Sequence, residues 1–298
     1  MLECVVNISE GRRPGVIAVV AAAAGPVLLD VHSDPDHNRS VLTLAGPLDR
    51  LAEAAFALAR VAVERIDLST HAGVHPRLGA VDVVPFVPLG DVGADGLATA
   101  GGVARAWAER AAGELGVPVF LYGRADPMGS SLPDVRRTAF RERRPDFGPA
   151  EPHPTAGAMA VGARPVLVAL NCELAPVRGG GDLDADLAVA RTVARAVRER
   201  DGGLSGVRAL GFGLASRGRA QVSMNLLDLA VTGVEAACAG VRRAAAEHGT
   251  EVTAVELVGL LPAAELERCS GEFLAWSGLS PERTIEARLD GAGGASSG

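Results

Sequence analysis

The residues best suited to proton transfer lie in one short stretch of the sequence. Residues 69–79 read STHAGVHPRLG and include His71, His75 and Arg77. Histidine exchanges a proton near neutral pH, because its ordinary pKa is about 6.5, and an arginine beside it can bind a carboxylate through two parallel hydrogen bonds. Pro76 disfavours the α conformation at His75. The stretch therefore predicts a rigid loop that presents an imidazole next to a guanidinium.

The spacing of this stretch also allows two other interpretations. One histidine could cap the preceding helix while the other binds backbone groups, which is a structural role only. A metal site is the other alternative, because His71 and His75 lie four residues apart, as in a helical zinc pair. Further ligands could come from Asp34, Asp36 and His37, in the polar segment SDPDHNR of residues 33–39. Gly73 interrupts the helical template, and we predict no metal site.

A third polar segment, residues 146–157, reads DFGPAEPHPTAG. Its three prolines and its glycines fix a defined path with exposed backbone groups. Such a path can donate and accept hydrogen bonds along the edge of a flat heterocycle. On composition alone, the segment could equally be a linker between domains.

Every fixed positive side-chain charge in this chain is an arginine. Lysine and arginine together number 29, and no lysine occurs in the sequence. This excludes chemistry that needs an amine side chain, such as a Schiff-base lysine, a pyridoxal-phosphate lysine or the lysine of a phosphate-binding loop. A net charge of −7 and an aromatic share of 3% argue against a nucleic-acid partner. Anionic small molecules remain possible ligands, because a local arginine cluster is enough to bind them.

Cysteine usage and hydropathy indicate the compartment. The four cysteines are widely spaced and form no CxxC pair, which is typical of a reducing environment: Cys4, Cys172, Cys238 and Cys269. The apolar run of residues 16–29 is broken by Gly25 and Pro26, and it is too short to cross a bilayer. It follows an acidic segment that does not resemble a signal peptide. We therefore expect a cytoplasmic protein with no membrane partner.

These polar segments need elements to position them, and the sequence predicts the same order of elements twice. In the first half, strands are expected at residues 2–8, 27–32, 40–44 and 81–87, and helices at residues 14–24 and 47–66. A helix at 94–115 and a strand at 118–122 follow, and residues 123–157 are expected to be irregular. In the second half, strands are expected at residues 165–171, 207–212, 220–225 and 252–257, and helices at residues 182–200 and 232–249. Thr232 and Glu235 are expected to form a capping box at the start of the last helix.

The repeated βαββαβ order predicts the fold class. It is an α+β fold of two tandem ferredoxin-like subdomains, with mixed or antiparallel sheets and helices on their outer faces. We place the first subdomain at residues 1–164 and the second at residues 165–289. Residues 290–298 are rich in Gly, Ala and Ser and are expected to form a flexible tail.

The sequence resembles the formiminotransferase family over residues 2–262. The most specific match is residues 68–86, LSTHAGVHPRLGAVDVVPF, and ECVVNISEGR at residues 3–12 and DPDHNRS at residues 34–40 match as well. PVFLYG at residues 118–123, DFGP at residues 146–149 and QVSMNLLD at residues 221–228 follow in the family's order. No segment that resembles the cyclodeaminase portion of larger relatives follows.

The resemblance implies a function and a site. The family transfers a formimidoyl group from N-formimidoyl-L-glutamate to N5 of tetrahydrofolate, releases L-glutamate and usually forms homodimers. Tetrahydrofolate is thus expected as the co-substrate, and no metal is expected. The histidine of the family's HPR triplet, His75 here, is implied as the catalytic acid and base. The predicted substrate-binding residues are Arg77, Arg39, Asn38, His37 and His71. The implied folate-binding residues are Gly148, Pro149, Ala150, Glu151, Pro152, His153, Pro154, Thr155, Ala156 and Gly157.

Three positions depart from the family pattern. Val6 replaces a proline, His32 stands where the family usually has an acidic residue, and Ala156 stands where some relatives carry a tryptophan. These departures keep a folate-dependent formyl-group transferase, or a relative with a shifted substrate, open as alternatives. A non-catalytic folate binder is a separate alternative. A metal-dependent hydrolase that uses Asp34, His37, His71 and His75 is a further alternative.

Overall fold

The computed structural model describes residues 1–90, 93–177 and 182–294. The chain divides into two compact units, residues 1–165 and 166–298, and each is described by itself. Each unit has its own sheet and its own hydrophobic core.

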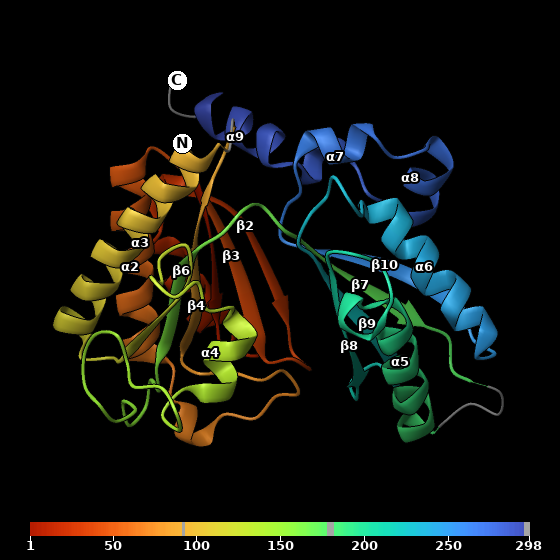
Figure 1. Ribbon diagram of the computed structural model, residues 1–298, viewed down its shortest axis with the longest axis horizontal. Helices are drawn as coiled ribbons and strands as arrows, with labels where there is room; N and C mark the ends of the chain where they lie inside the picture. Colours follow the sequence, from red (N-terminus) through yellow and green to blue (C-terminus); the bar gives the residue numbers. More distant parts are fainter. Residues whose placement is uncertain (91–92, 178–181, 295–298) are drawn as a thin grey trace. The chain divides into compact units, whose positions relative to one another are not determined.

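The first unit is built on a six-stranded sheet in the order β2-β3-β1-β4-β6-β5 (Figure 1). Its elements are β1 (Leu2–Ile8), α1 (Pro14–Ala22), η1 (Gly25–Val27), β2 (Leu28–Asp34), β3 (Arg39–Gly46), α2 (Leu48–Arg65), η2 (Leu68–Thr70), β4 (Val81–Pro88), α3 (Ala94–Leu115), β5 (Val119–Gly123), α4 (Leu132–Thr138) and β6 (Met159–Ala163). β1, β2, β3 and β4 pair antiparallel, whereas β6 is parallel to both β4 and β5. The sheet is therefore mixed.

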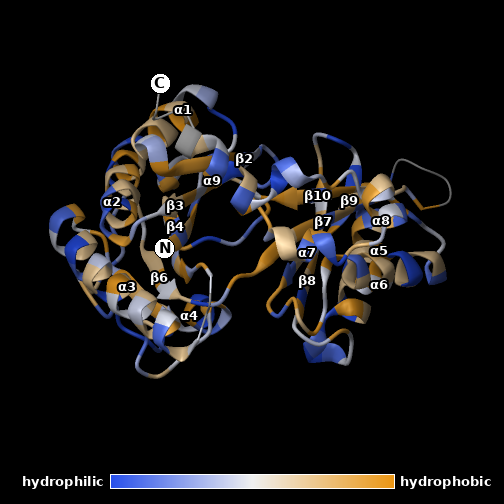
Figure 2. Cartoon of the chain, turned by 90° about the horizontal axis from the view of Figure 1, so that it is seen from above, coloured by the Kyte–Doolittle hydropathy of each residue, from blue (hydrophilic) through white to orange (hydrophobic). Residues whose placement is uncertain are grey.

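The two faces of this sheet differ in character. Alternate residues of β1, such as Cys4 and Val6, enter the main core, where residues of α1, α2 and α3 also lie (Figures 1 and 2). The residues between them on β1 point to the opposite face, since successive side chains of a strand alternate. On that face α4 packs through Val135 against Phe120 and Tyr122. The polar side chains of the candidate site belong to this second face.

Two elements of the first unit were not predicted. Residues 123–157 were expected to be irregular, but they contain α4, whose first turn holds Pro133 and is capped by the hydroxyl of Ser131. A seven-residue helix leaves too short a pattern for a periodicity argument. β6 was also missed, because it is buried on both faces and shows no alternation of apolar and polar residues.

The second unit has a four-stranded antiparallel sheet in the order β10-β7-β9-β8. Its elements are β7 (Val168–Leu174), α5 (Leu183–Val197), η3 (Glu199–Asp201), β8 (Val207–Leu214), β9 (Arg219–Leu226), α6 (Val234–Glu247), β10 (Val252–Val258), α7 (Ala263–Glu267), α8 (Gly271–Ser277), η4 (Pro281–Arg283) and α9 (Ile285–Gly294). The strand order repeats the order β4-β1-β3-β2 of the first unit, and α5 and α6 cover one face. The predicted α+β class with two βαββαβ sheets is confirmed.

Three local predictions for the second unit need correction. The strand expected at residues 165–171 is β7, which begins three residues later. Thr232 and Glu235 form no capping box, because Gly233 is the N-cap of α6 and the Val234 amide donates to Glu265 Oε1 at 2.7 Å. The Thr232 hydroxyl donates instead to Ser205 O, and Glu235 accepts from Ser270. At the chain end, α9 continues through residues 290–294, and residues 295–298 lie outside the described part.

None of the helices in the described ranges is long and apolar enough to cross a membrane.

Candidate active site

The candidate site is built where the loop of residues 71–80 docks on the turn between β2 and β3. Asn38 adopts a left-handed conformation in this turn, with φ of 48°. Its side-chain amide donates to Ala72 O at 2.9 Å, and its Oδ1 accepts from the Gly11 amide at 2.9 Å. The Val74 amide donates to Asp36 O. One asparagine thus ties together the end of β1, the hairpin turn and the loop that precedes β4.

Two glycines allow this loop to approach its neighbours closely. A Cβ atom at Gly73 would lie 2.4 Å from His37 O, and one at Gly79 would lie 2.0 Å from Ala158 O. Real Cβ atoms do not make such contacts, so only glycine fits at either position without a shift of backbone. Gly73, which was expected to interrupt a helix, therefore also determines how closely the loop packs, and Gly79 does the same.

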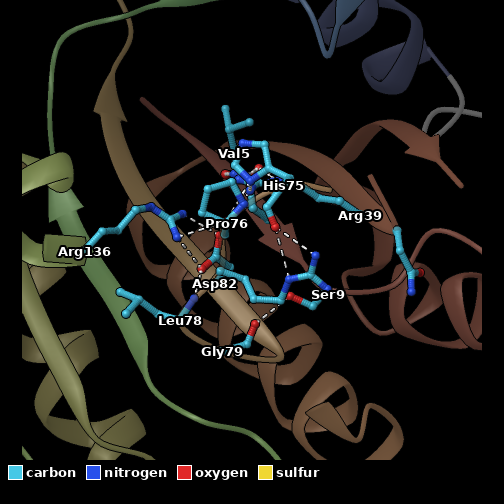
Figure 3. A network of polar contacts seen from close by, with 12 residues as sticks. Val5, Ser9, Arg39, His75, Pro76, Leu78, Gly79, Asp82 and Arg136 are labelled. Atoms are coloured by element: carbon cyan, nitrogen blue, oxygen red, sulfur yellow. Dashed lines mark hydrogen bonds and ion pairs between the residues drawn. The ribbon is translucent and has the colours of Figure 1, made fainter. Parts of the chain in front are cut away.

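His75 lies in the middle of the polar network (Figure 3). Its Nδ1 atom is 2.7 Å from Arg39 Nη1 and 2.7 Å from Pro76 O. Nδ1 can accept a hydrogen bond from Arg39 only when it carries no proton, and it can donate to Pro76 O only when it is protonated. Each neutral tautomer therefore satisfies only one of the two partners. When Nδ1–H donates to Pro76 O, Nε2 carries the lone pair that a general base needs.

Electrostatics keeps this imidazole neutral. Burial, and next the positive charge of Arg39, lower the pKa of His75 to about 2. The carbonyl of Pro76 and the carboxylate of Asp82 act in the opposite direction and are outweighed. The uncharged form, which can accept a proton, is therefore the form present at neutral pH.

Asp82 on β4 binds two arginines of the network, Arg39 and Arg136. It is only 1% exposed, and its Oδ2 pairs with Arg39 Nη1 at 3.1 Å and with Arg136 Nη2 at 2.5 Å. The Leu78 amide donates to Oδ1 at 2.7 Å. Burial alone would raise the pKa of Asp82, but Arg136 and Arg39 outweigh it and keep that pKa below its usual range. Asp82 is therefore a permanent anion between two arginines.

The two arginines predicted to bind substrate carboxylates already have partners within the protein. Arg39 Nε and Nη2 donate to Asn7 Oδ1, at 2.9 and 2.5 Å. Arg77 Nε and Nη2 donate to His75 O, at 3.3 and 2.8 Å, and its Nη1 lies 3.1 Å from His71 Nε2. Both guanidinium groups thus brace the His75 loop. Their assignment to substrate binding stays a prediction.

The remaining predicted polar residues lie in the same cluster. The rings of His37 and His75 are 5.8 Å apart, and the His37 amide donates to Asp34 Oδ1. His71 Nε2 lies 3.1 Å from Asn38 O, while its buried Nδ1 atom has no hydrogen-bond partner. The structure thus brings together the predicted residues of two segments more than thirty positions apart: His37, Asn38, Arg39, His71, His75 and Arg77.

The predicted folate-binding segment is fastened to the end of the His75 loop, just before β4. Ala80 N donates to Ala156 O, and Ala158 N donates to Leu78 O. His153 closes a turn of this segment, since its Nδ1 accepts from the Ala156 amide at 3.0 Å. Residues 148–152 and Pro154 are exposed. The segment is a rigid loop with an exposed middle, and its role in binding stays a prediction.

Sequence reasoning missed three members of the network: Asn7, Asp82 and Arg136. Asn7 and Asp82 stand within recognised motifs, so the resemblance could have pointed to them. Arg136 carried no such signal, because it lies on α4, which was not predicted, and reaches Asp82 across 54 positions of sequence. Figure 3 shows its guanidinium directed at Asp82 and Pro76.

The arrangement gives no support to the metal-dependent alternative. Among residues 1–90, 93–177 and 182–294, no three His, Cys, Asp or Glu side chains are gathered in a way that could hold a metal ion. The four side chains named for a hydrolase therefore do not form such a group.

Comparisons with known proteins show which family the sequence matches. Residues 1–164 match the formiminotransferase domain, N-terminal subdomain, and residues 182–280 match the formiminotransferase domain. The glutamate formimidoyltransferase of Streptococcus pyogenes serotype M1 is 38% identical over 281 residues, which are 89% of this chain and 90% of that relative. That of Thermoplasma acidophilum is 35% identical over 309 residues, 98% of each chain. The formimidoyltransferase-cyclodeaminase of Sus scrofa is 40% identical over 278 residues, 88% of this chain and 50% of that relative.

Proposed function

The chain belongs to the formiminotransferase family, and from this premise we propose that it is a glutamate formimidoyltransferase. It moves the formimidoyl group from N-formimidoyl-L-glutamate to N5 of tetrahydrofolate and releases L-glutamate. The observation that carries this proposal is the neutral imidazole of His75, whose Nδ1 lies against Pro76 O and Arg39. It supplies the proton transfer that this reaction requires at two points.

The proposed chemistry balances around one proton. N5 of tetrahydrofolate attacks the formimidoyl carbon, and a new N5–C bond forms. His75 Nε2 accepts the proton that N5 loses, while Nδ1–H donates to Pro76 O. The bond between the formimidoyl carbon and the glutamate nitrogen then breaks, and His75 returns the proton to that nitrogen. No net proton is gained or lost by the protein.

The charges around His75 suit a base that must also become an acid. While the site is empty, burial and Arg39 keep the pKa of His75 low. A substrate carboxylate bound beside this loop compensates part of the positive charge around His75 and raises the basicity of the imidazole. Binding of the anionic substrate therefore brings the proton affinity of His75 closer to what transfer requires.

The decisive experiment is a spectrophotometric assay of the purified protein with N-formimidoyl-L-glutamate and tetrahydrofolate. The wild-type protein is expected to turn over, and His75→Gln is expected to lose about 10²–10⁴-fold in kcat, the usual contribution of general acid–base catalysis. Tetrahydrofolate affinity, measured by calorimetry, is expected to stay within a few fold. Full turnover in His75→Gln would refute the assignment of His75. Turnover of N-formyl-L-glutamate in place of the formimidoyl donor would redirect the proposal to formyl transfer.

Three further parts of the proposal rest on family membership. Tetrahydrofolate binds along the loop of residues 148–157, the protein forms a homodimer, and it acts in the cytoplasm in histidine breakdown. Sedimentation velocity tests the dimer. For the loop, a double substitution in its exposed middle, Glu151→Gln with Pro152→Ala, is expected to raise the KM for tetrahydrofolate and to leave the KM for the donor unchanged.

A further inference from the structure

Recognition of the donor's carboxylates is the part of the proposed reaction that the network described above does not explain. Arg39 and Arg77 direct their donors at Asn7, His75 and His71. All three nitrogens of each guanidinium already have a protein partner. A carboxylate could therefore reach only their remaining N–H groups, or would have to displace one of these hydrogen bonds. A cation with unoccupied donors beside the same loop would bind it at lower cost.

Arg12 is such a cation. It follows β1, and its Nε donates to Pro35 O, in the turn between β2 and β3, at 2.7 Å. Its Nη1 and Nη2 atoms have no protein partner within the part of the chain that the structure describes. The side chain is exposed. The bond from Nε fixes the plane of the guanidinium, and the pair of Nη donors is left for a ligand.

The backbone around Arg12 is also held in place. The Arg12 and Arg13 amides both donate to Glu10 Oε1, at 2.8 and 2.9 Å, and the Gly11 amide donates to Asn38 Oδ1. A Cβ atom at Gly11 would lie 2.2 Å from Asp34 O, so the chain crosses directly over the hairpin here. Glu10 is 2% exposed. The backbone that carries Arg12 is therefore fixed against the hairpin.

Arg12 and Arg77 place two positive charges at one side of the loop. Burial is the main cause that lowers the pKa of Arg77; the carboxylate of Asp82 acts in the opposite direction, and the charge of Arg12 lowers that pKa further. The two guanidinium charges therefore lie within electrostatic reach of one another. Within the described residues, neither forms an ion pair with a carboxylate. The hairpin that anchors Arg12 also carries His37, whose ring is 5.8 Å from the ring of His75.

We infer that Arg12 binds a carboxylate of the departing glutamate through its two Nη donors, an inference that rests on the proposed formimidoyl transfer. The donor's carboxylates lie within a few bonds of the nitrogen that leaves. The glutamate of tetrahydrofolate is separated from N5 by the pterin and aminobenzoyl groups. A cation tied to the hairpin beside His75 therefore matches the donor. The planar fork of arginine suits a carboxylate better than an ammonium would.

The test compares Arg12→Gln, Arg12→Lys and wild type in the assay with both natural substrates. Arg12→Gln is expected to raise the KM for N-formimidoyl-L-glutamate about 10- to 100-fold, the loss that corresponds to charge-assisted hydrogen bonds, with kcat changed less than about threefold. The KM of Arg12→Lys for N-formimidoyl-L-glutamate is expected to lie between those of wild type and Arg12→Gln. Arg60→Gln removes the same charge from an exposed position of α2 and is expected to leave both KM values unchanged.

Modified substrates identify the carboxylate. Donors that lack one carboxylate, N-formimidoyl-4-aminobutyrate and N-formimidoyl-2-aminobutyrate, are compared in wild type and Arg12→Gln. One of them is expected to be used equally by both proteins, because the carboxylate that Arg12 binds is missing from it. Tetrahydropteroate, which lacks the glutamate of folate, is expected to leave the effect of Arg12→Gln unchanged.

Several outcomes overturn the inference. An unchanged KM for the donor in Arg12→Gln removes the basis for it. An increase that persists with both shortened donors shows that Arg12 binds neither carboxylate. An increase in the KM for tetrahydrofolate that disappears with tetrahydropteroate assigns Arg12 to the folate glutamate instead. Absence of turnover in the wild-type protein refutes the proposed function itself, and the inference about Arg12 with it.

Discussion

At the scale of single residues, two neighbours compete for one nitrogen of His75. Arg39 Nη1 and Pro76 O both lie 2.7 Å from Nδ1, although one is a donor and the other an acceptor. The cation favours the tautomer with its proton on Nε2, and the carbonyl favours the tautomer with its proton on Nδ1. Arg39 also pairs with Asp82, so a shift of its guanidinium toward that carboxylate would release Nδ1 to Pro76. This arrangement suits a group that alternates between base and acid.

The low pKa of His75 predicts its behaviour on titration. Because burial and Arg39 hold that pKa at about 2, the Cε1–H resonance of His75 is expected not to shift between pH 8 and pH 5 in the unliganded protein. Arg39→Gln removes the second of these causes, so the titration midpoint is expected to move upward. Proton NMR with His75→Gln as the assignment control measures both. A wild-type midpoint near 6.5 would contradict the prediction.

The same shift has a consequence for stability. Between pH 6.5 and pH 2 the unfolded chain protonates His75 and the folded protein does not, so the free energy of unfolding rises with pH in this window. Below pH 6.5 the loss amounts to at most about 1.4 kcal/mol for each pH unit. Urea unfolding at pH 5.5 and pH 7 is expected to show this slope in wild type and a smaller slope in His75→Gln. Equal slopes would show that His75 takes up a proton in the folded protein.

At the scale of elements, α4 contributes to the site although it is only seven residues long. Val135 of this helix is buried against the strands, and the next residue, Arg136, binds Asp82 and Pro76 O. The helix therefore connects the second face of the sheet, through Val135, with the loop that carries His75, through Arg136. Arg39 reaches the same carboxylate from β3.

Neighbouring arginines of α4 provide a matched test of this role. Arg136 pairs with buried Asp82, whereas Arg137 is 64% exposed in its side chain and pairs with exposed Asp134. Arg136→Gln is expected to lower the free energy of unfolding by about 1–3 kcal/mol, because it leaves a buried carboxylate with one cation fewer. Arg137→Gln is expected to lower the free energy of unfolding by less than about 1 kcal/mol.

Activity measurements on the same pair separate positioning from stability. Loss of Arg136 also frees the Pro76 carbonyl, so kcat is expected to fall while the KM for tetrahydrofolate stays within a few fold. Arg137→Gln is expected to keep the wild-type kcat. Equal effects of the two substitutions on unfolding and on kcat would show that Arg136 of α4 does not position the loop that carries His75.

At the scale of the whole molecule, the absence of lysine constrains how the protein binds anions. All fixed side-chain cations are arginines, and four of them, Arg12, Arg39, Arg77 and Arg136, lie around the His75 loop. Recognition of glutamate carboxylates must therefore rest on guanidinium groups, backbone amides or neutral donors. The planar guanidinium is the stronger carboxylate ligand among them.

Reagents selective for one side-chain type test this constraint. Phenylglyoxal, which modifies arginine, is expected to inactivate the protein, and N-formimidoyl-L-glutamate is expected to slow the inactivation. An amine-acylating ester finds no lysine side chain to modify in this sequence and is expected to leave turnover intact. Inactivation by the ester, or a phenylglyoxal rate that substrate does not change, would contradict this view of recognition.

Much of the fold could be predicted from the sequence because its signals are local. The strand at residues 2–8 and the helix at residues 94–115 were predicted with the bounds of β1 and α3. Such elements are determined by the spacing of apolar residues and by proline and glycine, which all lie within or next to the element in the sequence. Among the misses, α4, β6 and the expected capping box occur where a pattern is short, fully buried or replaced by a distant partner such as Glu265.

The sequence by itself determined the family, the repeated βαββαβ order and the histidine that stands in the HPR triplet. These properties rest on residue identities and their spacing, which folding does not change. Only the tertiary structure decided that Arg39 and Arg77 brace the loop, that Asp82 and Arg136 support it, and that Arg12 keeps two donors unoccupied. The physical reason is that a guanidinium binds whichever acceptors the folded chain places within reach. Those acceptors come from strands and turns that lie far apart in the sequence.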